Sequence, residues 1–375
     1  MAESSDVFRV PAEKAAELMS KSRLTLADVA HRAGVSVSTA SLAFSGAGPI
    51  AAATKQKVMR AADKLGYHGP NPLGRQLRSG RSGIVGVVVG DALRRSFRDP
   101  VSVRFLDGIA DSLGEQGLGV LLIPGKPASE NAGHASVNPL LTTAAMDVAV
   151  LIWGAHVGDE RLEILLDRHI PIVNVEGGSL EGVTRISIRD REASAELLRH
   201  LLELGHTKIA TVTLPIDRSG QRGLVDKDQL GNALWEISKR RVSAFNDVGV
   251  EPVAVWSTAS SLLDEGVHAA KELLSGPDRP TAIVAQSDLL AAGVILGARE
   301  LGLRVPEDLS VVGFDGVELP WLAPDKLTTA NQPLKAKGKA VGAAVAAILA
   351  GEKPEPLTLD VELIIGTTTA APSSS

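Results

Sequence analysis

Polar and aromatic residues stand where several apolar, strand-like runs of this 375-residue chain end. In open α/β sheets, ligands bind beyond the carboxyl ends of the strands. Trp153 follows the run 148–152 and offers a flat ring on which a sugar or a base can stack. Structural roles are the alternative, because Asp190 and Asp288 are also good helix N-caps and Trp153 could be a core residue. The candidate ligand contacts are Asp99, Trp153, Asp190, Ser287, Asp288 and Asp315.

The sequence holds no residue set typical of catalysis or metal binding. Its eight histidines are scattered, and although His200 and Glu203 share a predicted helix face, no third ligand accompanies them. It contains neither a Gly-x-Ser-x-Gly run nor a phosphate-binding loop. Cysteine is absent, which excludes disulfides and thiolate metal sites. We therefore expect a binding protein with no catalytic activity, metal or cofactor.

From Ile84 onward, apolar runs alternate with longer amphipathic segments. This βα alternation predicts parallel sheets covered on both faces, and so many strands favour two lobes over one sheet. We expect the run 310–314 to cross back into the first lobe, and the segment after Gln332 to enter the second. The predicted strands are Ile84–Val89, Gly119–Ile123, Val148–Ile152, Ile172–Val175, Arg185–Ile188, Lys208–Val212, Val253–Val255, Ala282–Ala285 and Ser310–Phe314. The predicted helices include Ser102–Gln116, Arg191–Leu204, Leu262–Leu274 and Asp288–Leu301.

Charge is distributed unevenly along the chain. The net charge is −5, yet residues 21–82 carry ten lysines and arginines against Asp28 and Asp63, a net of +8. The stretch from Gly83 to the last residue carries a net charge of −11. A small basic region attached to a large acidic one indicates that the basic region meets phosphate groups. A solvated basic surface without a partner is the alternative.

Three short helices are predicted in the basic region. The first begins after an N-cap at Thr25 and ends at Gly34, and the second begins after an N-cap at Ser36. The third begins at Thr54 and ends at Gly66. Two helices joined by so tight a turn are typical of a helix-turn-helix unit, whose second helix enters the major groove of DNA. A small three-helix bundle without DNA-binding function is the alternative.

The run LTLADVAHRAGVSVSTASLAFSG closely resembles the head of the lac repressor family of bacterial transcriptional regulators, and the similarity extends from about Leu24 to about Ala370. The resemblance implies an all-α helix-turn-helix head and an α/β, two-lobed, periplasmic-binding-protein-like (type I) core. It implies that Val37 and Ser38 contact base edges. It also implies phosphate contacts, which set register without carrying sequence information, from Thr25, Ser36, Thr39, Ser41 and Thr54.

The resemblance extends to a hinge between head and core. Asn71 would cap a short helix, and Leu77 would enter the minor groove and kink the DNA when two copies pair over it. A flexible linker is the alternative. The chain departs from the family pattern at three positions: Leu42 replaces an arginine that can pair with guanine, Gly69 is an extra residue, and Gly74 replaces an alanine. A leucine at position 42 could instead pack on a thymine methyl group.

The resemblance also implies roles for residues of the core. Asp315 would hydrogen-bond ligand hydroxyls, and Ser287-Asp288 would belong to a ligand-binding run. Arg241 would be a ligand clamp, although a different alignment places Ile237 at that position and removes the clamp. The implied ligand is a small-molecule effector, namely a sugar, a sugar phosphate or a nucleoside, and both induction and corepression stay open.

These observations predict a sequence-specific transcriptional regulator, acting as a repressor on palindromic double-stranded operator DNA as a homodimer. The first twenty residues lack the apolar core of a signal peptide and no apolar run is long enough for a membrane helix, so we expect a cytoplasmic, nucleoid-associated protein. A secreted solute-binding protein with the same core fold is the alternative function. The predicted divisions are a mobile extension (1–22), a helix-turn-helix domain (23–68), a hinge helix or linker (69–82), an effector-binding and dimerisation core (83–366) and a disordered tail (367–375).

Overall fold

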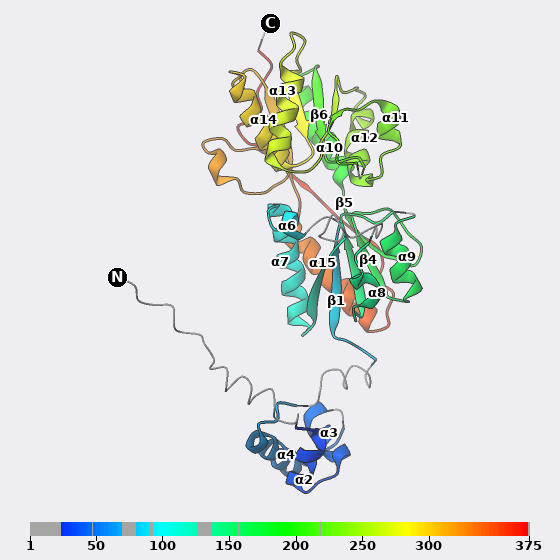
Figure 1. Ribbon diagram of the computed structural model, residues 1–375. Helices are drawn as coiled ribbons and strands as arrows, with labels where there is room; N and C mark the ends of the chain where they lie inside the picture. The colour runs from blue at the N-terminus through cyan, green and yellow to red at the C-terminus, as the bar shows by residue number, and fades with distance from the viewer. Residues whose placement is uncertain are drawn as a thin grey trace, which may run out of the picture. The chain divides into compact units, whose positions relative to one another are not determined.

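The computed structural model describes residues 24–46, 48–69, 80–90, 93–125, 137–156, 158–217 and 219–373. Contacts divide the chain into two compact units, one ending at Arg81 and the other beginning at Ser82 (Figure 1). The predictions made for the extension 1–22 and for the hinge residues Asn71 and Leu77 lie outside the described residues. In the part of the chain that the structure describes, no helix combines the length and apolarity that crossing a membrane requires.

The described part of the head contains three helices around a small apolar core. In the first N-cap, the Thr25 hydroxyl accepts from the backbone N–H of Asp28, and the Asp28 carboxylate accepts from the backbone N–H of Thr25 at 2.8 Å. Gly34 ends this helix at a φ of +59°, which suits glycine, and Ser36 caps the next one. These boundaries confirm the first two predicted helices. The helices are α2 (Leu26–Ala33), α3 (Val37–Ser45) and α4 (Ala52–Leu65).

The predicted start of the third helix at Thr54 is wrong by two residues. Helix α4 begins at Ala52 after Ala51, whose side chain makes no capping hydrogen bond. Thr54 lies in the first turn instead. Alanine has the highest helix propensity, so the Ala-rich stretch before Thr54 enters the helix without a hydroxyl cap.

The core consists of two sheets, each covered by helices on both faces. In the first sheet all strands run parallel, in the order β12-β5-β4-β3-β1-β2. Alternate residues of β1 face opposite layers: Val87 packs towards α7 and α15, and Val88 towards α8 and α9. The strands are β1 (Ile84–Val89), β2 (Gly119–Pro124), β3 (Val148–Ile152), β4 (Ile172–Val175), β5 (Thr184–Ile188) and β12 (Leu357–Leu359). The helices of this lobe are α6 (Leu93–Ser96), α7 (Pro100–Glu115), α8 (Leu140–Thr143), α9 (Glu160–Asp167) and α15 (Leu334–Leu349).

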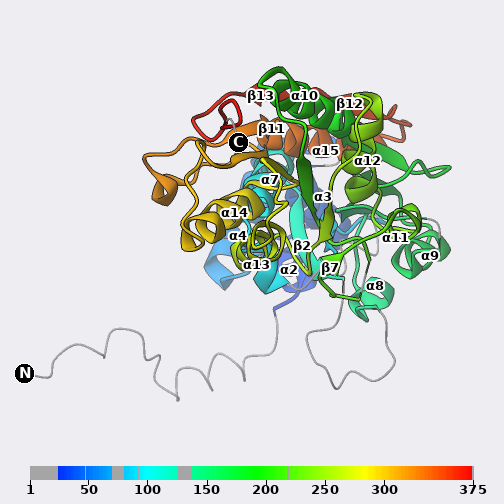
Figure 2. The ribbon, with the colours of Figure 1, turned by 90° about the horizontal axis from the view of Figure 1, so that it is seen from above.

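The second sheet has the order β13-β11-β10-β9-β6-β8-β7, with antiparallel strands only at its two edges. Helices α13 and α14 lie side by side on one face, and α10 and α12 cover the other (Figure 2). The strands are β6 (Ile209–Thr213), β7 (Gly223–Leu224), β8 (Val255–Ser257), β9 (Ala282–Ala285), β10 (Ser310–Asp315), β11 (Thr328–Asn331) and β13 (Glu362–Ile364). The helices are α10 (Asp190–Glu203), α11 (Lys227–Gly231), α12 (Glu236–Asp247), α13 (Leu263–Leu274), α14 (Asp288–Glu300) and the 3-10 turn η1 (Pro320–Leu322).

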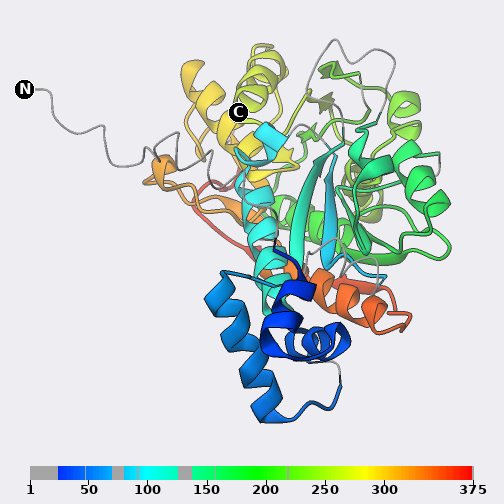
Figure 3. The ribbon, with the colours of Figure 1, turned by 60° about the horizontal axis from the view of Figure 1, so that its bottom comes forward.

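The predicted strands agree with the observed ones to within one residue at each end, except that β8 begins and ends two residues after the predicted Val253–Val255. The expectation for the run 310–314 is wrong, because β10 stays in the second sheet between β9 and β11. The βαβ unit β9-α14-β10 closes onto the same sheet, as right-handed crossovers of this kind do. The segment after Gln332 first enters the first lobe, where α15 packs against α7 (Figure 3) and β12 joins the first sheet; it then returns to the second sheet, as predicted, with β13.

The prediction that residues 367–375 form a disordered tail is also wrong for the residues described, which extend to 373. Thr368 is fully buried; its hydroxyl donates to the backbone oxygen of Val311 at 2.7 Å and accepts from the backbone N–H of Thr328 at 3.0 Å. The backbone N–H of Ala370 donates to the Ser310 hydroxyl. A run of threonines carries no apolar pattern, but its hydroxyls satisfy backbone groups at the sheet and so hold it in place.

Candidate functional site

The N-terminus of α3 presents an exposed group of hydroxyls. The Ser36 Oγ lies 2.8 Å from both the Ser38 Oγ and the Thr39 Oγ1. Val37, which directly follows Ser36, is 50% exposed. Hydroxyls at a helix N-terminus can donate to phosphate oxygens, and an exposed apolar side chain beside them can contact a base. These four residues form the surface that the sequence predicted for DNA contact.

The other predicted DNA contacts are dispersed around this group. Thr25 is exposed at the start of α2, and Thr54 is half-buried in the first turn of α4. Ser41 and Leu42 are half-buried on α3, and the Leu42 side chain lies against Gly48. The side chain at the position where the family pattern has an arginine thus lies close to the backbone at Gly48.

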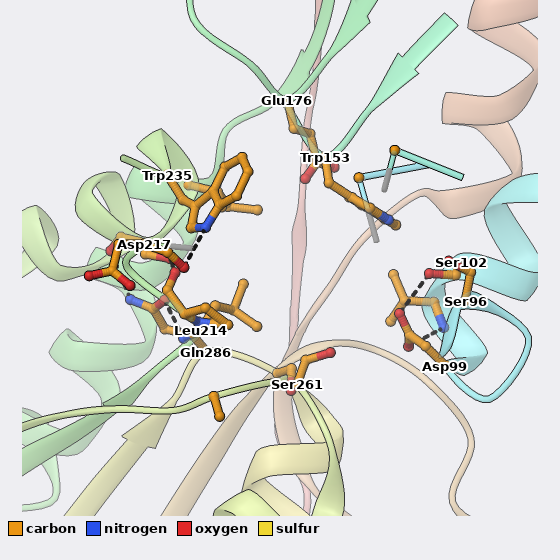
Figure 4. Close-up of a pocket in the computed structure, with 18 of the residues that line it drawn as sticks. Ser96, Asp99, Ser102, Trp153, Glu176, Leu214, Asp217, Trp235, Ser261 and Gln286 are labelled. Carbon is orange, nitrogen blue, oxygen red and sulfur yellow. Dashed lines mark hydrogen bonds between the residues drawn. The ribbon is translucent and has the colours of Figure 1, made fainter. Parts of the chain in front are cut away.

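A cavity of about 300 Å³ lies between the two lobes of the core, at the carboxyl ends of their parallel strands. Figure 4 places Asp99 and Trp235 on opposite walls, with Trp153 on the wall between them. Within the part of the chain that the structure describes, no group of three or more histidine, cysteine or carboxylate residues could hold a metal ion. Five of the predicted ligand contacts line the cavity, namely Asp99, Trp153, Arg241, Ser287 and Asp315.

Two predicted contacts, Asp190 and Asp288, are absent from the cavity wall. The Asp190 carboxylate pairs with Arg240 at 2.9 Å. Asp288 accepts hydrogen bonds from the Thr329 hydroxyl at 2.6 Å and from the backbone N–H of Val317 at 2.8 Å. In this structure both carboxylates are therefore held by groups of the protein itself. They are not the N-caps of their helices either, because Arg189 precedes α10 and the Ser287 hydroxyl caps α14.

Arg241 lies almost fully buried, at 3% exposure, with its guanidinium 3.5 Å from the centre of the Phe314 ring. Its Nη1 donates to the backbone oxygen of Gln286, while its Nε has no hydrogen-bond partner among the described residues. Ile237, the residue favoured by the other alignment, also lines the cavity one helical turn earlier. Both alignments therefore place their residue on the same cavity wall. Arg241 lies where a ligand clamp would be expected.

The wall of the first lobe also carries an arginine that was not predicted from the sequence. Arg161 is 4% exposed and donates to the Asp159 carboxylate through Nε at 3.0 Å and through Nη2 at 2.5 Å. Asp159 also caps α9, through the backbone N–H of Arg161. Burial alone would raise the pKa of Asp159, but the Arg161 guanidinium holds that pKa below its ordinary value. The Asp-x-Arg spacing at the start of a helix could have predicted this pair, because it places the arginine within reach of the aspartate that caps the helix.

Three other cavity residues have a positive backbone φ, which residues other than glycine rarely adopt. Trp153 and Glu176 have a φ of +63° and Asp315 a φ of +127°, and these residues stand at the carboxyl ends of β3, β4 and β10. Such strain persists only where surrounding structure enforces it, and it concentrates at functional sites. It marks the strand ends at which the fold presents side chains to the cavity.

A chain of hydrogen bonds connects the two lobes behind this wall. The Lys337 ammonium pairs with Glu176 and donates to the Gln332 side-chain oxygen at 2.8 Å. The Gln332 amide then donates to Asp315 at 2.6 Å. Burial, together with the neighbouring carboxyl of Asp288, raises the pKa of Asp315 well above its ordinary value. The same burial makes the protonated form of Asp315 easier to reach than that of an exposed aspartate.

The chain matches two known families. It fits the bacterial regulatory proteins of the lacI family over residues 25–71, and the periplasmic binding protein-like domain over residues 198–369. It is 34% identical to the HTH-type transcriptional regulator IpsA of Corynebacterium glutamicum over 346 residues, which cover 90% of this chain and 94% of the relative. It is 33% identical to the HTH-type transcriptional regulator Rv3575c of Mycobacterium tuberculosis, covering 94% of this chain and 98% of the relative.

Solved structures agree with these relatives. A crystal structure of a LacI-family transcriptional regulator from Corynebacterium glutamicum superposes with a TM-score of 0.68 at 28% identity, covering 93% of this chain and 100% of the other. A complex of the transcriptional regulator CelR with cellobiose superposes with a TM-score of 0.64 at 26% identity, covering 92% of this chain and 100% of the other. The helix-turn-helix head, the two-lobed core and these similarities together show that the chain belongs to the lacI family of bacterial transcriptional regulators.

Proposed function

We propose that this regulator represses transcription as a homodimer on a palindromic operator, and that an uncharged saccharide in the cavity between its lobes controls operator affinity. One short helix contacts few base pairs, so a two-fold dimer is needed to recognise a full site. Because the target is chromosomal DNA, the proposal places the protein in the cytoplasm at the nucleoid. The observation that carries the ligand class is the pair of tryptophans on the cavity wall, one from each lobe.

The two tryptophans are held in place by their neighbours. The Trp153 ring packs on Phe105, with 5.8 Å between ring centres, and the Trp235 indole N–H donates to the backbone oxygen of Asp217 at 3.2 Å. Both side chains are half-buried, so each keeps ring surface available to the cavity. Rigid aromatic faces suit the apolar C–H faces of sugar rings, while the surrounding carboxyls and amides suit hydroxyls.

The charge of the wall separates the ligand classes that the sequence left open. Among the described residues, six carboxyl residues line the cavity, together with two arginines, Arg161 and Arg241. The donors of Arg161 that face Asp159 are already engaged. A phosphate would bring further negative charge into an acidic, partly buried site, which is unfavourable. The balance therefore supports a neutral sugar over a sugar phosphate, and the CelR complex with cellobiose is a similar protein that holds such a ligand.

Thermal unfolding of the full-length protein tests the ligand class. We expect stabilisation by a neutral saccharide from a panel of D-glucose, cellobiose, glucose 6-phosphate and adenosine, since a ligand bound only by the folded state raises its stability. The saccharide that stabilises the protein should also change operator affinity in a DNA-binding titration. A greater stabilisation by glucose 6-phosphate or adenosine would contradict the proposal.

A matched pair of variants tests the cavity itself. Trp235→Ala should weaken saccharide binding by roughly tenfold, because it removes one aromatic face. Trp321→Ala serves as the control, since Trp321 is 51% exposed and is absent from the cavity wall. Equal saccharide affinity in the two variants would show that the sugar binds elsewhere.

A further inference from the structure

Lys337 is a fully buried lysine on α15, at 0% exposure, and it is absent from the cavity wall. Its ammonium pairs with Glu176 and donates to Gln332. It also lies 5.0 Å from the centre of the Phe105 ring and 5.3 Å from that of Trp153, distances at which an aromatic face attracts a cation. A buried ammonium is costly unless it is paired and hydrogen-bonded, and these contacts supply both.

Three of these partners, Glu176, Gln332 and Trp153, are themselves on the cavity wall. They come from separate parts of the chain: Trp153 follows β3, Glu176 follows β4, and Gln332 lies between β11 of the second lobe and α15 of the first. A single cation thus stands directly behind three wall residues that no local sequence element links.

Among these partners, Glu176 is the one whose ionisation depends on the charge of Lys337. It is 2% exposed, and its Oε1 accepts a hydrogen bond from the Lys337 ammonium. Its buried Oε2 accepts no hydrogen bond from the residues that the structure describes. Two further charges face it from α12, those of Arg241 and Arg240, and the latter also donates to its backbone oxygen at 3.4 Å. Burial alone would raise the pKa of Glu176, but Lys337 and then Arg241 hold that pKa below its ordinary value.

We propose that Lys337 is a positioning residue for the ligand cavity: it keeps Glu176 ionised as a fixed hydrogen-bond acceptor on the wall and, through Gln332, sets the place of Asp315. The role rests on the cavity being the saccharide site proposed above. An ionised Glu176 accepts hydrogen bonds from ligand hydroxyls and repels ligand anions, so Lys337 selects neutral, donor-bearing ligands without touching them.

The first experiment needs no ligand and follows thermal unfolding of the full-length protein between pH 5 and pH 8. Lys337→Met removes the charge and keeps an unbranched chain, so Glu176 is left buried with its nearest counter-ion gone and its folded pKa rises. A carboxyl whose folded pKa is raised destabilises the folded state increasingly as pH increases. The Tm deficit of Lys337→Met should therefore grow with pH, by roughly 5 °C or more at pH 8.

Two further proteins make this readout specific. The double variant Lys337→Met/Glu176→Gln should recover the pH profile of the unmodified protein, because a neutral amide needs no counter-ion. Lys335→Met is the matched control, since Lys335 lies on the same helix but is exposed and pairs with Asp111 at the surface at 3.3 Å. If the Lys337→Met and Lys335→Met profiles run parallel, or if the double variant keeps the pH-dependent deficit, Lys337 does not govern Glu176 and the proposal fails. If Lys337→Met does not fold, recovery in the double variant decides the question.

The second experiment measures the shift in Tm caused by cellobiose and D-glucose in the same proteins at pH 7.5. We expect at least tenfold weaker saccharide binding in the double variant than in Lys335→Met, with operator affinity unchanged. Equal saccharide affinity in these two proteins overturns the positioning role. Should the unmodified protein respond to no sugar, the proposed ligand class fails, whereas the pH profiles still judge the link between Lys337 and Glu176.

Discussion

The head and the core hold their functional groups in opposite ways. In the head, the predicted DNA contacts at the start of α3 are four consecutive residues, 36–39, three of them bearing hydroxyls, and Ser36, Val37 and Ser38 are exposed. In the core, the cavity residues span the chain from Gly90 to Gln332, and several of the ionisable ones, among them Arg241, Glu176 and Asp315, are buried. Short-range chemistry builds one site, and long-range packing builds the other.

This difference separates the two tasks of the protein physically. The head carries exposed hydroxyls and a net charge of +8. Its contacts with DNA phosphates are therefore weakened by salt, and its DNA affinity should fall steeply as the salt concentration rises. The buried groups of the core are screened little by salt but are sensitive to protonation and to the loss of a partner. Substitutions in the head should therefore change DNA affinity, while those in the core should change ligand response and pH dependence.

Removal of residues 1–81 should have the largest effect. The remaining core is a compact unit with a net charge near −11, so it should fold yet bind operator at least about a thousandfold more weakly. Fluorescence anisotropy with labelled operator at two salt concentrations measures the loss, and circular dichroism checks the fold. Specific operator binding by the truncated core would break the division between the two regions.

Substitution of Asp315 should affect ligand binding in a way that reports its protonation. Because burial and the neighbouring Asp288 raise the pKa of Asp315 well above its ordinary value, the neutral Asp315→Asn should retain saccharide affinity within roughly twofold at pH 7. Asp315→Gly accepts the φ of +127° but leaves Gln332 without its acceptor, and should weaken binding by about tenfold or more. Calorimetry with the responding sugar compares them, and operator affinity should stay unchanged in both. An Asp315→Asn variant as impaired as Asp315→Gly would mean that the native residue acts as a carboxylate.

The pH dependence of core stability should reveal Asp288. Burial raises the pKa of this carboxyl from 3.8 to about 6, despite its hydrogen bond from Thr329. A raised folded pKa means that stability is greatest below the unfolded pKa and is lost as pH rises through the folded one. Between pH 5 and pH 8 the wild type should therefore lose about 1.5 kcal/mol relative to Asp288→Asn. Denaturant unfolding of both proteins across this range gives the difference, and parallel curves would show that Asp288 does not titrate there.

Loss of a helix cap in the head should have the smallest effect. Ser36→Ala removes the hydroxyl that accepts from the backbone N–H of Thr39 at 3.1 Å, and should lower the stability of the head by about 1 kcal/mol. Ser38→Ala is the control, because the Ser38 hydroxyl contacts Ser36 without capping the helix. Thermal unfolding of residues 1–81 measures both. Equal stability of the two variants would mean that the N-cap of α3 adds nothing beyond the exposed hydroxyls.

The sequence by itself determined the features that depend on neighbours along the chain. The caps at Thr25 and Ser36 and the strands Val148–Ile152, Ile172–Val175 and Ala282–Ala285 were predicted at their observed positions. Hydroxyl caps act within three residues, and apolar runs mark buried parallel strands directly, so a local pattern is enough. The same locality explains why Trp153, Ser287 and Asp315, which stand at or just after strand ends, were predicted to line the cavity and do so.

Only the tertiary structure decided which charges are buried together. Lys337 stands 161 residues after Glu176, and neither residue has a local pattern that distinguishes it from a surface charge. Asp190 and Asp288 were predicted from the sequence as ligand contacts. In the fold their carboxylates accept hydrogen bonds from Arg240 and Thr329, respectively. Whether a buried group is ionised depends on the free-energy cost of its desolvation and on the stabilisation that its charged partners provide. Those partners come from distant parts of the chain, because the chain crosses between the two lobes.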